Sequence, residues 1–176
     1  MDNNLAIVYL SILLTLLSIA GFVILRQIFK TRRIETALSR LQKKLTKEKG
    51  TAQEYYELGG IYLDKKLYAQ AIAMLQKAIK AGEEEGEENI ALIYNALGFS
   101  YFSQQQYDLA IRQYKEALKH NPKYVTALNN LAHTYERKNL MSQALQTYDQ
   151  VLQSEPSNNT AKRRAEKLRR RLVTST

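Results

Sequence analysis

Three segments of the chain share one residue pattern, and its spacing is the strongest constraint on the fold. Each copy has Tyr or Leu, then a Leu-Gly or Leu-Ala step, then a tyrosine, and later an alanine followed by Leu or Tyr. The copies begin at Tyr55, Tyr94 and Leu128, so the second and third are offset by 34 residues and the first and second by 39. This spacing predicts helix pairs that stack on one another and share a continuous core.

Small residues in each copy predict where the two helices of a pair come closest. They are Gly59, Gly98 and Ala132 from the first helices, and Ala71, Ala110 and Ala144 from the second helices. Because protein interiors are close-packed, larger side chains at these positions would push the two helices apart. Pro122 and Pro156 end the second and third copies, where a residue that cannot continue a helix is expected.

The pattern resembles the tetratricopeptide repeat (TPR), which consists of two antiparallel helices. It predicts an all-α fold with a three-repeat TPR solenoid over residues 51–158, the repeats covering 52–85, 91–124 and 125–158. Residues 159–176 are predicted to form a basic capping helix and tail, because apolar residues there recur at helical spacing. These apolar residues are Ala161, Ala165, Leu168 and Leu172.

An acidic run occupies residues 83–88, where five residues are inserted between the first two copies. Its first residue, Glu83, stands where the other copies have their closing proline. We interpret the run as a longer solvated loop, and the alternative is an acidic lure for a peptide.

An apolar segment near the N-terminus predicts a single transmembrane helix within residues 1–25. Residues 5–25 contain 21 residues without a charge, enough to span roughly 31 Å of bilayer at about 1.5 Å per residue. No basic side chain precedes the segment, which argues against a cleaved signal peptide. Basic residues instead follow it, which predicts that the repeats stay on the cytoplasmic or stromal side.

Hydroxyl side chains in the span allow two interpretations. Ser11, Thr15 and Ser18 lie at helical spacing, and Gly21 follows them. We interpret the hydroxyls as bonded to carbonyls of their own helix, and the alternative is a face that packs on another transmembrane helix.

Positive charge is concentrated on both sides of the repeats. Residues 26–50 carry a net charge of +7, residues 51–161 of −3 and residues 162–176 of +6. This distribution argues against nucleic-acid binding and predicts contact of residues 26–50 with anionic lipid. The same segment is expected to be an amphipathic linker helix with an apolar seam at Ile34, Leu38, Leu41 and Leu45. We expect this helix to pack on the first repeat, and the alternatives are the membrane surface and a partner helix.

The chain shows no pattern of an enzyme, a metal centre or a cofactor site. It has two histidines and no cysteine, and its seven glycines are scattered rather than gathered in a phosphate-binding loop. We therefore expect no catalytic residue, no metal, no cofactor and no small-molecule substrate.

The functional surface of a TPR fold is the groove lined by the first helix of each repeat. Counting along the repeats places ten residues there: Tyr56, Gly60, Leu63, Asp64, Asn95, Phe99, Phe102, Asn129, His133 and Arg137. Aromatic anchors with a few polar groups suit an extended segment or a helix of a protein partner. The alternative for Phe99 and Phe102 is burial against other parts of the fold. Known TPR clamps for terminal carboxylates have Lys and Asn where this chain has Tyr56 and Gly60, so we do not expect such a clamp.

The whole chain resembles the small membrane-anchored TPR proteins of cyanobacteria and algal plastids that assist photosystem I assembly and stability. The resemblance rests on the apolar span, the Lys30-Thr31-Arg32-Arg33 segment after it, the repeat count and the basic tail. It implies a thylakoid location, with photosystem I subunits or other assembly factors as partners. The alternatives are a membrane-bound receptor in protein targeting or translocation, and an assembly factor for a bacterial envelope complex.

Overall fold

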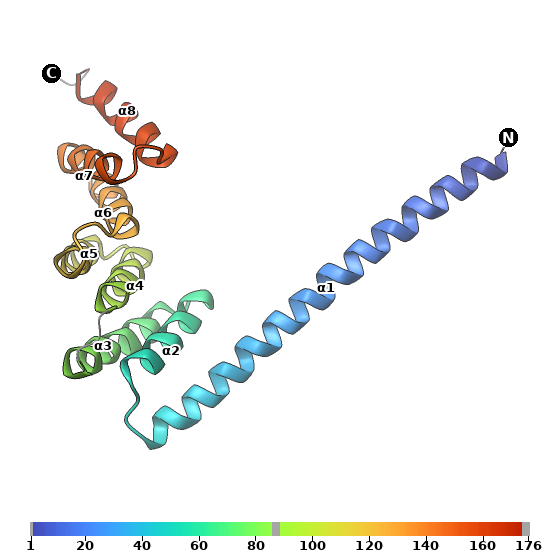
Figure 1. The fold of residues 1–176 in the computed structure, drawn as a ribbon, viewed down its shortest axis with the longest axis horizontal. Coiled ribbons are helices and arrows are strands. Elements are labelled where there is room, and N and C mark those ends of the chain that lie inside the picture. The colour runs from blue at the N-terminus through green and yellow to red at the C-terminus, as the bar shows by residue number, and fades with distance from the viewer. Residues whose placement is uncertain (1, 86–88, 174–176) are drawn as a thin grey trace. The chain divides into compact units, whose positions relative to one another are not determined.

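All regular elements in the described part of the chain are α-helices, which confirms the prediction of an all-α fold. The computed structural model describes residues 2–85 and 89–173 (Figure 1). The chain divides into two units between Lys47 and Glu48, which are described separately. The first unit contains α1 (Asp2–Lys47), and the second contains α2 to α8.

The first unit is one uninterrupted helix, α1. Within the described residues, it is the helix that is long and apolar enough to cross a membrane. The expected boundary at residue 25 is a change of composition rather than of structure. Residues 26–47 continue the same helix, because they include no glycine or proline that would interrupt it.

The three hydroxyls of the apolar segment bond within α1. Ser11, Thr15 and Ser18 each donate to a carbonyl oxygen three or four residues earlier, at 2.7–2.8 Å. These bonds agree with the interpretation that the hydroxyls satisfy themselves on their own helix.

The second unit is a run of short helices in which each packs against the next along the chain (Figure 1). The helices are α2 (Ala52–Asp64), α3 (Tyr68–Glu85), α4 (Ile90–Ser103), α5 (Tyr107–His120), α6 (Val125–Arg137), α7 (Met141–Ser154) and α8 (Asn159–Val173). α2 to α7 form three pairs joined by short turns, and α8 packs on α7. Ala161, Ala165 and Leu168 of α8 are buried there, as their helical spacing predicts.

The three turns within the pairs share one backbone conformation. Lys66, Gln105 and Asn139 have φ angles of 59°, 60° and 62°, and they are offset by the same 39 and 34 residues as the sequence pattern. In each turn, the residue after the left-handed one donates its N–H to a carbonyl five residues earlier, at 2.8–2.9 Å. This is a Schellman-type ending, which satisfies carbonyls left free at the end of a helix.

The predicted close contacts within the pairs are present. A Cβ atom added at Gly98 would lie 2.7 Å from ring atoms of Tyr114, and one at Gly59 would lie 2.9 Å from Leu75 Cγ. Both facing side chains are fully buried, and so are Ala71, Ala110 and Ala144. Only a small residue fits between the helices at these points.

The interpretation of the acidic run as a loop beginning at Glu83 is wrong for its first three residues. α3 continues through Glu85 and has 18 residues, where α5 and α7 have 14 each. The inserted residues therefore lengthen the helix, as expected from the helix propensity of glutamate. Residues 86–88 lie outside the described residues.

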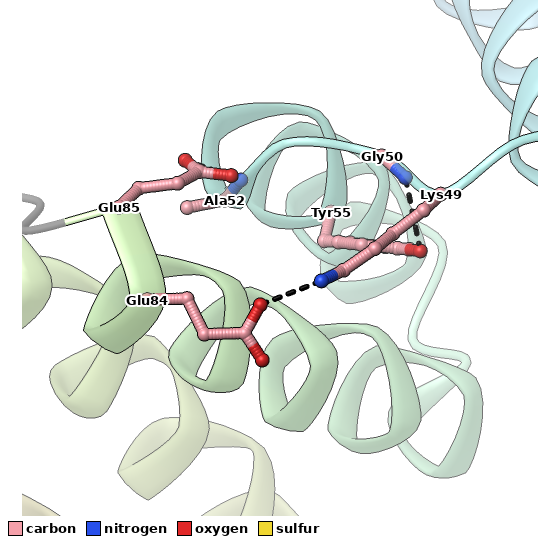
Figure 2. A network of polar contacts seen from close by, with 6 residues as sticks. All are labelled: Lys49, Gly50, Ala52, Tyr55, Glu84 and Glu85. Atoms are coloured by element: carbon pink, nitrogen blue, oxygen red, sulfur yellow. Dashed lines mark hydrogen bonds and ion pairs between the residues drawn. The ribbon is translucent and has the colours of Figure 1, made fainter.

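The carboxylates of this extra turn bind groups around the start of α2 and on α4. Glu84 forms an ion pair with Lys49 at 2.5 Å, and Glu85 accepts a hydrogen bond from the backbone N–H of Ala52 at 3.2 Å (Figure 2). Tyr94 of α4 donates its hydroxyl to Glu83 at 3.1 Å. Burial and this bond raise the pKa of Tyr94 to about 12. The run thus connects the start of the first pair to the second pair.

Candidate protein-binding groove

The ten residues predicted for binding lie on α2, α4 and α6, the first helices of the three pairs. α4 contacts both α2 and α6, so the three helices form one continuous row. None of the ten residues is fully buried. Each of them therefore presents surface that a partner could contact.

The apolar residues of the row lie on α2 and α4. Tyr56 and Leu63 of α2 are half-buried, and no atom lies within 4 Å of the place where a Cβ of Gly60 would be. Phe99 of α4 is 44% exposed, so it is not buried against other parts of the fold. Leu92, two turns earlier on the same helix face, is 37% exposed. Sequence counting missed Leu92, although its spacing from Phe99 was a sufficient signal.

Asn95 at the centre of α4 is a structural bridge. Its side-chain oxygen accepts a hydrogen bond from Asn130 of α6 at 3.0 Å, and its amide nitrogen donates to the Tyr124 hydroxyl at 3.4 Å. Burial is the main cause that raises the pKa of Tyr124, and the Asn95 bond partly opposes it. Asn95 therefore joins two helix pairs and has less capacity for a partner than its position suggested. Sequence reasoning missed Asn130 and Tyr124, because no local signal indicates a pairing across 29 to 35 residues.

Phe102 connects the apolar part of the row with its polar end. Its ring centroid lies 5.1 Å from that of His133 on α6 and 5.6 Å from that of Tyr107 on α5. Phe102 is half-buried in this contact, so it is closer to the burial alternative than Phe99. Its ring packs against His133 and Tyr107 and so leaves less surface for a partner than Phe99 does.

The remaining predicted residues are polar. Asp64 at the end of α2 is exposed. The side-chain oxygen of Asn129 is buried and accepts no hydrogen bond from the described residues. Arg137 ends α6 and binds the hydroxyl of Tyr107. The row thus combines exposed apolar residues on α4 with polar residues on all three helices, and it ends in Arg137 on α6.

This arrangement has the chemistry of a binding surface. Exposed Leu92 and Phe99 can anchor apolar side chains of a partner, and polar groups along the row can orient its backbone. Among the described residues, no group of His, Asp and Glu side chains is placed to hold a metal ion.

Comparisons with known proteins agree on the repeat. Models of the tetratricopeptide repeat match residues 52–81, 98–139 and 127–162. The chain is 39% identical over 165 residues to the ycf37 protein of Cyanophora paradoxa, a match that covers 93% of this chain and 95% of that protein. It is 37% identical to the ycf37 protein of Guillardia theta over 91% of this chain and 89% of the relative.

A longer plant protein is also similar. The chain is 36% identical over 164 residues to the chloroplastic tetratricopeptide repeat domain-containing protein PYG7 of Arabidopsis thaliana. The match covers 93% of this chain and 54% of PYG7, so this chain corresponds to about half of the plant protein.

Solved structures show the same fold. The structure of MamA matches with a TM-score of 0.72 at 21% identity, over 79% of this chain and 78% of MamA. The first TPR domain of Spaghetti (RPAP3), bound to the HSP90 peptide SRMEEVD, matches with a TM-score of 0.64 at 21% identity, over 72% and 96% of the two chains. At this identity, the likeness shows the fold alone.

Proposed function

Because the chain belongs to the ycf37 family of tetratricopeptide repeat proteins, we propose that it is a membrane-anchored scaffold that assists the assembly or stability of photosystem I. It acts by binding photosystem subunits or other assembly factors. The observation that carries the proposal is the exposed apolar surface of Leu92 and Phe99 on the row of α2, α4 and α6. A TPR fold is a protein-interaction scaffold, and this surface is where a partner finds anchors.

The proposed location is the thylakoid membrane, with a single span in α1 and the repeats on the cytoplasmic or stromal side. The name of PYG7 places that relative in the chloroplast. This and the apolar segment of α1 support the proposed location. The basic residues that follow the span support the orientation. The anchor confines the groove to the membrane, which raises its effective concentration for membrane-bound partners, so that modest affinity is enough.

Affinity purification of the tagged full-length protein from detergent-solubilised thylakoids tests the proposal. The wild-type protein is expected to bring down photosystem I subunits. The double variant Leu92→Ala/Phe99→Ala should lose most of them while keeping its helical circular dichroism, because interfaces concentrate energy in a few anchors.

A matched control is available in Leu67→Ala/Leu109→Ala. Leu67 and Leu109 are 42% and 41% exposed, but they lie outside the row of α2, α4 and α6. The control should retain the photosystem I subunits. Equal losses in both double variants would refute the groove as the binding surface. Translocase subunits in place of photosystem subunits would identify the protein as a targeting receptor.

A further inference from the structure

A hollow of about 320 Å³ lies between α6 and α8, next to the Phe102–His133 contact. Its polar lining consists of His133, Glu136 and Arg137 from α6, and Arg164, Lys167 and Arg171 from α8. Four basic side chains and one carboxylate thus line the hollow. A concave site lined by charges of one sign attracts ligands of the opposite sign more strongly than a flat surface does.

Two of the guanidinium groups are held in place. Arg164 donates to Glu136 at 2.9 Å, and the Glu136 side chain is only 13% exposed. Arg137 donates to the hydroxyl of Tyr107 through Nε and Nη2, at 3.3 and 3.1 Å. Because the acceptor is a hydroxyl rather than a carboxylate, this bond positions Arg137 without pairing it with an acidic side chain.

The environment of His133 agrees with an excess of positive charge. Burial lowers the pKa of His133 first, and the charges of Arg164 and Arg137 lower it further, against the opposing effect of Glu136. His133 is therefore neutral at pH 7 and leaves the arginines and Lys167 as the charges of the hollow.

We propose that this hollow binds an acidic segment of the partner protein that lies along the α2, α4 and α6 row. Planar guanidinium groups bind carboxylates in a two-pronged geometry, and those of Arg137 and Arg164 are already oriented. The hollow adjoins Phe102, so a chain that contacts Phe99 can continue into it. The occupant is thus a segment with apolar residues followed by aspartates or glutamates. This inference rests on the proposed function, because it assumes a protein partner.

A membrane surface fits the hollow less well. A bilayer is flat, and it would meet exposed cations of α8 outside the hollow, such as Lys162 and Arg163, as readily as those that line it. These two residues do not line the hollow. Replacing both residues therefore removes two positive charges outside the hollow and serves as a control.

The experiment measures fluorescence anisotropy with the full-length protein in neutral detergent. The probe is a fluorescein-labelled peptide with one phenylalanine followed by alternating aspartates and glutamates, and the control peptide replaces these acids with asparagine and glutamine. The protein is expected to bind the acidic peptide and not its amide counterpart. The variant Arg137→Gln/Lys167→Gln should weaken binding at least about tenfold, because it removes charge-assisted hydrogen bonds.

The matched variant Lys162→Gln/Arg163→Gln loses the same charge and should keep affinity within about threefold, since neither residue lines the hollow and charges that act through solvent are screened. Equal effects of the two variants would overturn the proposal in favour of diffuse attraction. Displacement of the peptide by an equal concentration of free glycerol phosphate would also overturn it, and would assign the hollow to phosphate. If photosystem I subunits still co-purify with Arg137→Gln/Lys167→Gln at the wild-type level, this inference fails while the proposed function stands.

Discussion

Replacing Gly98 with alanine tests the closest contact between α4 and α5. A Cβ at this position would lie 2.7 Å from Cδ1 and Cε1 of Tyr114, well inside the normal contact distance of carbon atoms. Tyr114 is 1% exposed, so its ring is enclosed by packed neighbours. The added methyl group must push the helices apart or force the ring off its preferred rotamer. Overpacking of this kind costs about 1–3 kcal/mol.

Gly60 provides a control within the same type of helix. No atom lies within 4 Å of the place where its Cβ would be. Replacing a glycine inside a helix with alanine stabilises the helix by about 0.5–1 kcal/mol, and this gain applies at both positions. The difference in unfolding free energy between Gly60→Ala and Gly98→Ala therefore isolates the steric cost. We expect Gly60→Ala to be more stable than wild type, and Gly98→Ala to lie about 1–3 kcal/mol below Gly60→Ala.

The measurement is urea unfolding of residues 48–176, followed by far-ultraviolet circular dichroism. This fragment corresponds to the second compact unit. The third pair has Ala132 and Tyr148 at the matching positions, both buried, so a helix pair can hold a methyl group there when its spacing allows it. Equal stability of Gly98→Ala and Gly60→Ala would show that α4 and α5 relax to such a spacing at no cost, and would refute the steric argument.

Three further predictions concern the turns, the acidic turn of α3 and the topology. Gln105→Gly should raise the unfolding free energy by about 0.5–1 kcal/mol, because the left-handed conformation strains glutamine, whereas Asn139→Gly should change it little; urea unfolding compares the two. Lys49 lowers the pKa of Glu84 below its usual 4.5, so their ion pair stabilises the fold above that pH and loses this effect as the pH falls through the lowered value. Glu84→Gln should therefore lower the melting temperature more at pH 7 than at pH 3, and an equal shift at both would contradict an ionic role. Protease added to thylakoids whose stromal face is outward should digest the repeats without detergent; protection would reverse the predicted orientation.

The sequence predicts the helix pairs because the same packing positions recur in all three copies. The same small residue, tyrosine and alanine positions recur in each copy, and any one of them would be weak evidence alone. The uninterrupted α1 was also predictable, since residues 26–47 contain no helix-breaking residue. The predicted boundary at residue 25 follows the change from apolar to charged residues, and α1 is continuous across it.

The contacts that sequence reasoning missed are long-range and polar. The Lys49–Glu84 pair and the bond of Ala52 to Glu85 join residues 33 to 35 positions apart. The left-handed turns at Lys66 and Gln105 lack the usual glycine signal, because the Schellman hydrogen bonds and the packed helix pair impose the conformation. Such features depend on where the helices meet, which the residue pattern does not encode locally.

Equivalent positions of the three repeats differ in how strongly packing restricts the residue type. The positions of Gly59, Gly98 and Ala132 hold small residues in every copy because the facing helix permits nothing larger. The next position in each copy holds three unrelated residue types, Gly60, Phe99 and His133. Packing within the pair does not restrict this position. One surface of the same scaffold can therefore change from apolar at α4 to basic beside α8 without altering the fold. For this reason, Gly98→Ala is expected to act on stability and Phe99→Ala on binding, and a variant that changed both would show that the two surfaces are coupled.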